Sequence, residues 1–381
     1  MNILFFLGVY PGGGGVERVT TCLANDFVRQ GHICSLVSFE ERDGDFSETL
    51  DKSVKLFKLR YPTFSLENIR QLRKIVKEQN IDIIINQWAI PFYVAILLKL
   101  ACKGNGTRII SVHHNRPDTN QTLTTLSSIM ENGSRSLTTS AKYHIIKLIS
   151  QVSLRITYEL SDYFVVLSKA YIKTLKEFIR VKDKRNKIRH IYNPLTIQAP
   201  QQPTCKENIV LYVGRIEYTP KKTFRVVDIW RKIEPEHPNW KLCILGDGPD
   251  AEGLQQRIAE SGTQNIQFMG FKNPIEWYQR SKMLLLVSDY DGFGLVIVEA
   301  MSYDVVPIVF NSYPTAAEII DNGINGVLTP TPYNIDDMVN SLSKLMSDDN
   351  LLSQMSQQAK EKSKIFSRSA IVNEWKKIIL E

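Results

Sequence analysis

The sequence has no uninterrupted apolar run near the roughly 20 residues that a membrane-spanning helix needs. The longest candidate, residues 89–102, is broken by Pro91 and Lys99, so we predict a buried helix there. The first ten residues, MNILFFLGVY, lack the positive start of a signal peptide and lead into a Pro-Gly turn, which is typical of a strand. We therefore expect neither a membrane-spanning nor an exported chain, but a cytoplasmic protein.

Cysteine is also scarce. The five cysteines are odd in number, and no two have the CxxC spacing of a zinc ribbon. A disulfide framework and a structural zinc site are disfavoured, and a reducing compartment fits. Apolar residues make up 43% and charged residues 23%, which excludes a disordered or collagen-like chain. A length of 381 residues favours two or three domains.

The net charge of +7 is unevenly divided. Residues 1–196 contain 28 Lys and Arg against 17 Asp and Glu, whereas the remainder contains 19 against 23. This asymmetry indicates either an anionic partner for the first half, such as phospholipid headgroups, a lipid phosphate or nucleic acid, or a solvated excess without a partner. No recognisable nucleic-acid module accompanies the charge, so we do not expect nucleic acid to bind.

The most basic segment is Lys169–Arg189. It holds nine Lys or Arg against Glu177 and Asp183. Large apolar residues stand between these charges, namely Tyr171, Ile172, Leu175, Phe178 and Ile179. A basic amphipathic segment can rest on an anionic leaflet, which would make the protein peripheral on the inner face of the plasma membrane.

The order of apolar and amphipathic stretches predicts an α/β fold. Apolar strands, including residues 2–8, 81–86 and 108–113, alternate with helical stretches, which is the signal of a parallel sheet covered by helices. Residues 119–160 are polar and predicted helical. The same alternation starts again with a strand at residues 209–213.

We therefore predict two doubly wound, Rossmann-like domains that face each other across a cleft. The segment around the middle of the chain contains three prolines and few large apolar residues, which marks a linker. The predicted parts are an N-terminal domain over residues 1–196, a linker over 197–206, a C-terminal domain over 207–365 and a final helix over 366–381 that crosses back onto the first domain.

A run of four glycines follows the first predicted strand and leads directly into a helix, as Pro11-Gly12-Gly13-Gly14-Gly15-Val16-Glu17-Arg18. Glycines let backbone N–H groups approach a ligand closely, and a helix N-terminus adds partial positive charge. A phosphate or sugar could dock there, although a flexible turn would show the same sequence. The dinucleotide fingerprint fails because Arg18 stands where a third glycine is required.

Two further loops contain chemistry-bearing groups. Arg215 follows the strand at residues 209–213, and Lys221 and Lys222 precede the next helix. Fixed cations at a strand end suit a diphosphate leaving group, although a solvated pair of cations is equally consistent. Residues 245–251 match GxGxxA, but no acidic residue ends the following strand, so a tight turn explains the match.

The most informative stretch is residues 288–301, SDYDGFGLVIVEAM. Asp291 lies in the loop after a buried strand, and Glu299 lies in the helix that begins after Gly292 and Gly294. Glu299 is a carboxylate in an otherwise apolar helical segment, so it needs a partner when buried. A ribose diol would serve, and so would an Arg or Lys from the core.

These motifs together resemble glycosyltransferase family 4, whose members have the two-domain GT-B fold. The hallmark of that family is two acidic residues separated by seven others within an EGFG-like turn and an EAM helix, and the chain reads DGFGLVIVEAM. Five further matches follow in the expected order: GGVER at 14–18, GR at 214–215, a lysine before the next helix, LGDGP at 245–249 and NGVL at 325–328.

The resemblance implies a retaining transfer of a sugar from a nucleotide-sugar to an acceptor hydroxyl, with no bound metal or other cofactor. It also implies that the acceptor is a glycan or lipid-linked saccharide of cell-envelope polysaccharide synthesis. Carried over by position, the resemblance places Gly14 and Gly15 near the donor phosphates and the acceptor. It places Arg215, Lys222 and the amides of Gly294 and Leu295 on the diphosphate. Glu299 would bind the ribose, and Asp291 would lie near the transferred sugar.

A histidine belongs to the same implied site. His113 and His114 end a strand, and we favour His114, which could hydrogen-bond a sugar hydroxyl, although a structural histidine would fit the same position. The chain departs from the family pattern where Asp291 replaces glutamate and where Asp304 replaces glycine. Relative to the family pattern, two residues are added between Arg215 and Lys222, which makes Lys221 a substitute for Lys222.

Two other functions remain open on these residues. A nicotinamide oxidoreductase is also built from two such domains, but the imperfect glycine fingerprints argue against it. A sugar-nucleotide or glycan-binding protein without catalysis is the second, and the substitution at Asp291 is its best argument.

Overall fold

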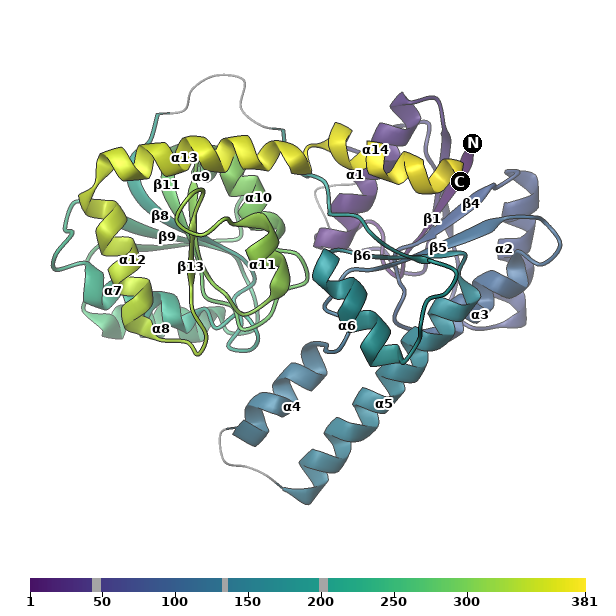
Figure 1. The fold of residues 1–381 in the computed structure, drawn as a ribbon, viewed down its shortest axis with the longest axis horizontal. Helices are drawn as coiled ribbons and strands as arrows, with labels where there is room; N and C mark the ends of the chain where they lie inside the picture. Colours follow the sequence, from purple (N-terminus) through teal and green to yellow (C-terminus); the bar gives the residue numbers. More distant parts are fainter. Residues whose placement is uncertain (43–48, 132–135, 199–204) are drawn as a thin grey trace. The chain divides into compact units, whose positions relative to one another are not determined.

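The computed structural model describes residues 1–42, 49–131, 136–198 and 205–381. These residues form two compact units. Unit 1 comprises residues 1–196 together with 368–381, and unit 2 comprises residues 197–367. Each unit is built around one parallel sheet with helices packed on it, as the alternating sequence pattern predicts (Figure 1). Most of the predicted linker, residues 199–204, lies outside the described residues.

The sheet of unit 1 has the strand order β3-β2-β1-β4-β5-β6-β7. Its strands are β1 (Asn2–Phe6), β2 (Ile33–Ser38), β3 (Lys55–Lys58), β4 (Ile83–Asn86), β5 (Arg108–His113), β6 (Tyr163–Val166) and β7 (Ile188–His190). Its helices are α1 (Gly15–Arg29), α2 (Leu66–Glu78), α3 (Phe92–Ala101), α4 (Gln121–Glu131), α5 (Leu137–Leu160), α6 (Lys169–Ile179) and α14 (Arg368–Leu380). All of β4 and all of β5 except Arg108 are buried, which explains their continuous apolar sequences.

The sheet of unit 2 has the order β10-β9-β8-β11-β12-β13. Its strands are β8 (Glu207–Val213), β9 (Lys241–Leu245), β10 (Ile266–Gly270), β11 (Ser281–Leu286), β12 (Val306–Phe310) and β13 (Val327–Thr329). Its helices are α7 (Phe224–Ile233), α8 (Ala251–Ser261), α9 (Ile275–Arg280), α10 (Leu295–Ser302), α11 (Pro314–Ile319), α12 (Ile335–Ser347), α13 (Asp349–Ser363) and the short 3-10 helix η2 (Lys364–Phe366).

The strand order reverses direction once in each sheet, between β1 and β4 in unit 1 and between β8 and β11 in unit 2. Open parallel sheets bind ligands outside the carboxyl ends of their strands at such a switch point. In unit 1 the glycine-rich loop follows β1. In unit 2 the loop after β8 carries the predicted cations, and the loop after β11 carries Asp291 and leads into α10, which contains Glu299. The sheet order of unit 2 therefore brings its own separate motifs to one edge.

Helix α14 belongs to unit 1 although it follows unit 2 in the chain (Figure 1). It packs against α1, and its buried side chains are Ile371, Val372, Trp375, Ile378 and Ile379. The Arg108 guanidinium donates to the carbonyls of Ile378 and Ile379, and the Tyr163 hydroxyl donates to Glu381 at 2.7 Å. The predicted return of the C-terminal helix to the first domain is therefore confirmed.

The basic segment Lys169–Arg189 differs from its prediction. Its large apolar residues do not face solvent, because Tyr171, Leu175, Phe178 and Ile179 are buried in a core cluster together with Tyr158 of α5. The predicted apolar contact of this segment with a leaflet was wrong. Its amphipathic pattern serves packing of α6 onto its own unit and leaves an exposed surface that is mainly basic, with Glu177 also exposed.

Candidate functional site

Backbone contacts join the loop after β8 to the turn after β9. The Gly214 N–H donates to the Leu245 carbonyl at 3.0 Å, and the Ile216 N–H donates to the Asp247 carbonyl at 2.9 Å. A Cβ atom at Gly246 would lie 1.8 Å from the Gly214 carbonyl oxygen. The glycine of the GxGxxA match therefore permits two backbones to touch, which agrees with the interpretation as a tight turn.

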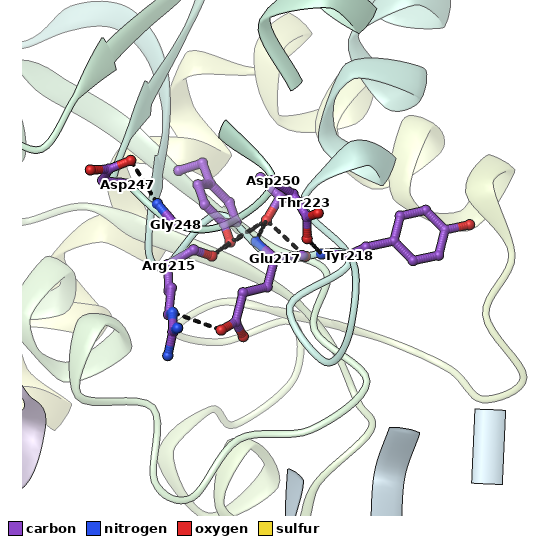
Figure 2. Close-up of polar contacts among 8 residues, drawn as sticks. Arg215, Glu217, Tyr218, Thr223, Asp247, Gly248 and Asp250 are labelled. Carbon is purple, nitrogen blue, oxygen red and sulfur yellow. Dashed lines mark hydrogen bonds and ion pairs between the residues drawn. The ribbon is translucent and has the colours of Figure 1, made fainter. Parts of the chain in front are cut away.

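Side chains fix the rest of the loop after β8 (Figure 2). The Tyr218 N–H donates to the Asp250 carboxylate at 2.6 Å. The Thr223 hydroxyl lies 3.1 Å from the Tyr212 hydroxyl and accepts from the Glu217 N–H at 3.4 Å. These contacts hold both ends of the segment that carries the predicted cations, so those cations project from an ordered backbone.

Arg215 extends from this loop toward solvent. Its Nε donates to Glu217 Oε1 at 2.7 Å, with the Arg215 side chain 61% exposed and the Glu217 side chain 7% exposed (Figure 2). The buried carboxylate orients the guanidinium while leaving donors on its exposed end. Such a planar fork suits an oxyanion or a phosphate.

The two predicted lysines both form ion pairs with carboxylates of the loop after β11. Lys221 Nζ lies 2.7 Å from Asp291 Oδ2, and Lys222 Nζ lies 3.6 Å from Asp289 Oδ2. Lys222 also lies over the Tyr218 ring, 5.1 Å from its centroid. The fold thus brings Lys221 and Asp291 together across 70 residues of sequence.

The ammonium of Lys221 stays charged at neutral pH. Burial acts to lower the pKa of Lys221, but the negative charges of Asp291 and the other neighbouring acidic groups outweigh burial and raise that pKa above its ordinary value. Both partners are partly exposed, at 25% and 21%, so a ligand can reach the pair. A phosphate could therefore replace Asp291 as the partner of the Lys221 ammonium, or bind that ammonium together with Asp291.

Arg225 is a contributor that the sequence did not identify. Its Nη1 donates to Asp289 Oδ1 at 2.5 Å and to the Val287 carbonyl at 3.0 Å. These bonds tie the first turn of α7 to the start of the loop after β11. The available signal was a third cation within a few residues of Lys221 and Lys222, at the start of the predicted helix.

The loop after β11 ends at the N-terminus of α10. Gly294 adopts a left-handed backbone, φ 84°, directly before the helix, and the Gly292 N–H donates to Asp291 Oδ1 at 2.7 Å. Most residues avoid φ values of this sign, which accounts for glycine at position 294. The amide of Leu295 opens the helix, and first-turn amides together with the helix dipole favour an anion at this end.

Glu299 is completely buried on α10. The Tyr278 hydroxyl of α9 donates to Glu299 Oε2 at 3.2 Å. The expected need for a partner is thus met at one oxygen by a neutral hydroxyl. Tyr278 was missed because an aromatic residue in a short helix is ordinarily interpreted as part of the core.

Asp304 keeps the turn that a glycine would form at its position. Its backbone is left-handed, φ 61°, as a glycine there would allow. Its carboxylate pairs with Lys360 at 2.9 Å, and its carbonyl accepts from the Ser356 hydroxyl at 2.7 Å. Aspartate is among the residues that tolerate this conformation, so the departure from the family pattern leaves the turn intact.

In unit 1 the glycine-rich loop forms the start of α1. Gly14 is the N-cap residue, Gly15 is the first helical residue, and both are exposed. A Cβ atom at Gly14 would lie 2.3 Å from Glu17 Oε2, so the Glu17 carboxylate already occupies space over this loop. Burial raises the pKa of Glu17. The sequence did not single out Glu17, although an acidic residue in a first helical turn is a recognised signal.

His113 is the last residue of β5, and His114 follows it directly; β5 lies next to β4 in the sheet. His113 is 2% exposed, and its Nε2 has no hydrogen-bond partner among the described residues. His114 Nε2 lies 2.6 Å from Gln87 Oε1 at the end of β4. Burial lowers the pKa of His113 to about 4 and, with the neighbouring His113, that of His114 to about 3. Both imidazoles are therefore neutral at pH 7.

The buried His113 predicts a specific pH dependence of stability. Because its folded pKa lies below the unfolded value near 6.5, the unfolded state binds more protons between pH 6.5 and pH 4. The contribution of neutral His113 to stability is therefore fully present above pH 6.5. Its protonation alone should lower the free energy of unfolding by roughly 3 kcal/mol at pH 4. Urea unfolding of the wild type and of His113→Asn at pH 7.5, 6 and 5 measures the difference.

The variant His113→Asn keeps an amide donor near the position of Nδ1 but does not titrate. We expect its stability to fall less steeply with acid than that of the wild type. Parallel curves for the two proteins would show that His113 does not titrate as the fold requires.

The described residues contain no group of three or more His, Cys, Asp or Glu placed to hold a metal ion. All five cysteines are free thiols, and Cys205 alone of them is exposed. Within the described parts of the chain, no helix is long and apolar enough to span a membrane.

Two family models match the chain in succession. "Glycosyltransferase Family 4" matches residues 13–198, and "Glycosyl transferases group 1" matches residues 196–362. An uncharacterized glycosyltransferase of Haemophilus influenzae is 27% identical over 387 residues and covers 99% of both chains. A Campylobacter jejuni N-acetylgalactosaminyltransferase, named for an undecaprenyl-diphosphate-linked saccharide, is 24% identical over 392 residues, covering 100% of this chain and 99% of the relative.

A solved structure agrees with these matches. Anabaena HepE, crystallised with UDP and glucose, superposes with a TM-score of 0.73 at 19% identity and covers 100% of this chain and 99% of its own. That likeness shows the fold, and the family models cover both units. The chain is a glycosyltransferase with the GT-B fold and belongs to glycosyltransferase family 4.

Proposed function

We propose that the enzyme transfers a hexose-type sugar from a nucleotide-diphosphate sugar to a hydroxyl of a glycan or lipid-linked saccharide, with retention of anomeric configuration. The proposed reaction uses no metal or other cofactor. The reaction would belong to the synthesis of a bacterial cell-envelope polysaccharide. The observation that supports the donor class best is the set of cations at the switch point of unit 2.

The cations and amides there match the needs of a diphosphate leaving group. Negative charge grows on the diphosphate as the bond to the sugar breaks, so fixed positive groups lower the barrier. Arg215 offers an oriented guanidinium, and Lys221 and Lys222 each offer an ammonium that is now paired with aspartate. The α10 N-terminus adds the amides of Gly294 and Leu295.

The other roles follow from the family resemblance. Glu299 would bind the ribose, and Asp291 would lie near the transferred sugar while keeping Lys221 in place. In unit 1, Gly14 and Gly15 would contact phosphate or acceptor. His114 would accept or donate a hydrogen bond to a sugar hydroxyl as a neutral imidazole, because its pKa of about 3 leaves it uncharged.

The proposed acceptor rests on the relatives and on charge. The Campylobacter relative is named for an acceptor attached to undecaprenyl diphosphate, which is an anionic lipid carrier. The excess of Lys and Arg over Asp and Glu in residues 1–196 would attract such a carrier or the leaflet that holds it. Peripheral attachment to the inner face of the plasma membrane would then bring enzyme and acceptor together.

Release of nucleoside diphosphate tests the proposal. The purified chain is incubated with a panel of UDP- and GDP-sugars and with a membrane extract that contains lipid-linked saccharides. We expect one donor to be consumed, and Glu299→Ala to reduce the rate strongly. If donors bind but none is consumed with any extract, the chain is a binding protein and the transferase proposal fails.

A further inference from the structure

Helix α5 extends beyond the body of unit 1. Figure 1 shows α4 and the first part of α5 projecting as a hairpin away from the sheet. The buried residues of α5 lie only near its C-terminal end, at Ser153, Leu154, Thr157 and Tyr158. The preceding four turns of this 24-residue helix therefore do not contribute side chains to the core.

The projecting part of α5 has an exposed aliphatic face. Ile145, Leu148, Ile149 and Val152 are 58%, 59%, 58% and 47% exposed. Their spacing of three, four and seven residues places them on one side of the helix. A monomeric protein in water gains nothing from four adjacent exposed aliphatic side chains, so such a patch marks an interaction surface. We call these four residues the α5 stripe.

Basic residues flank the α5 stripe, and acidic residues are absent from it. At 100° per residue, Lys142 and Arg155 fall on opposite borders of the stripe. Lys142, Lys147 and Arg155 are the Lys and Arg residues of α5, and its one carboxylate, Glu159, lies beyond the α5 stripe in the last turn of the helix. An aliphatic centre with cationic borders is the pattern of a helix that lies in the interface of an anionic bilayer.

The charges argue against a second copy of the chain as the occupant. A symmetric contact between two α5 stripes would bring Lys142 and Arg155 of both copies into one interface, with Glu159 as the one carboxylate of each helix to offset them. Phospholipid headgroups supply the missing negative charge, and acyl chains accept the aliphatic side chains. The helix would lie on the membrane rather than cross it, because no described helix is apolar enough to span one.

We infer that the α5 stripe inserts into the headgroup region of an anionic phospholipid bilayer and that Lys142 and Arg155 bind its phosphates. The inference deepens the proposed function, since it rests on an acceptor that is held at a membrane. It also assigns membrane contact to a surface different from the basic segment Lys169–Arg189, whose apolar residues are in the core.

Vesicle binding without donor or acceptor tests the inference independently of turnover. The full chain is sedimented with vesicles of phosphatidylglycerol and phosphatidylcholine at equal proportions, and with vesicles of phosphatidylcholine alone. The test variant is Ile145→Ser/Ile149→Ser. The matched control is Ile33→Ser/Ile324→Ser, because all four isoleucines are 58% exposed and the control pair lies outside α5.

We expect the wild type and the control to bind the anionic vesicles, and the test variant to bind roughly tenfold or more weakly because it removes two inserted side chains. Binding should decrease when salt is raised from 0.1 M to 0.5 M. Thermal melting of the test variant should match that of the control, since its changes are on the surface.

Several results would overturn the inference. One is equal binding of test and control variants, and another is equal binding of the wild type to neutral and anionic vesicles. A third is a wild-type dimer in light scattering that the test variant converts to a monomer, since the stripe would then join two copies. A second, largely basic surface is a hollow of about 1070 Å³ lined by Lys58, Arg60, Glu67, Arg70, Gln71 and Lys74. The fourth contradicting result is loss of binding in Arg60→Gln/Arg70→Gln but not in the test variant.

Discussion

Replacement of Arg215 by alanine is expected to lower kcat/KM for the sugar donor by about 100-fold or more. The guanidinium is held by the buried Glu217 at 2.7 Å and exposes its other donors, so it is positioned before the donor arrives. Its loss would leave charge on the departing diphosphate uncompensated in the transition state. Initial rates of nucleoside diphosphate release, measured across donor concentrations, give the two kinetic constants.

Two further variants make this prediction specific. Arg231→Ala changes an exposed arginine of α7 in the same unit and should leave kcat/KM unchanged. Arg215→Lys should recover only part of the rate, because an ammonium cannot form the paired hydrogen bonds of a guanidinium. A loss below about threefold in Arg215→Ala would remove Arg215 from the proposed leaving-group machinery.

Gly246→Ala is expected to destabilise the protein by roughly 3–5 kcal/mol. The new Cβ would lie 1.8 Å from the Gly214 carbonyl oxygen, and the backbone at Gly246 has φ 149°. The clash involves backbone on both sides, so no side chain can rotate to relieve it. Because Gly214 precedes Arg215, any shift that relieves the clash would also displace the guanidinium.

Gly253→Ala is the matched control for this change. A Cβ at Gly253 in α8 would meet the Phe224 ring at 3.5 Å, which is an ordinary contact. Alanine also favours a helix more than glycine does, so the control should be neutral or slightly more stable. Thermal and urea unfolding compare the three proteins, and similar stability of the two variants would contradict the close approach after β8 and β9.

The arrangement of strands was predictable because the information is local. Buried parallel strands such as β4 and β5 are continuous apolar runs, and glycine or proline stands in several connections, such as Gly31 between α1 and β2 and Pro91 before α3. The position of the candidate site was predicted by the same reasoning, since ligand loops of such sheets follow their strands, and it stays a prediction. The left-handed backbone at Gly294 is the kind of feature that a single glycine in a motif can indicate.

Side-chain partners were less predictable because they depend on elements far apart in sequence. The sequence required a partner for Glu299 but did not identify Tyr278, which has no charge and lies in another helix. Arg225 binds the loop after β11, and Glu17 lies over the glycine-rich loop. These contacts were not predictable, because only the folded chain defines the paths of the two loops. The pairing of Lys221 with Asp291 needs β8 and β11 to be neighbours, which is a property of the sheet order.

The basic surfaces show a further limit of sequence patterns. Both α5 and α6 alternate apolar and basic residues, and periodicity alone does not say whether an apolar face meets the protein or something outside it. Helix α6 packs onto its own sheet, so Leu175 and Phe178 are buried. Helix α5 extends past the core, so Ile145 and Leu148 remain exposed.

A crystal structure of the chain with a bound UDP- or GDP-sugar tests the central claim most directly. We predict that the diphosphate oxygens lie within hydrogen-bond distance of the Arg215 guanidinium, of the ammonium of Lys221 or Lys222, and of the first amides of α10. The same structure would show which lysine binds phosphate and whether Glu299 reaches the ribose. A diphosphate bound elsewhere, with Arg215 still paired only to Glu217, would contradict the account.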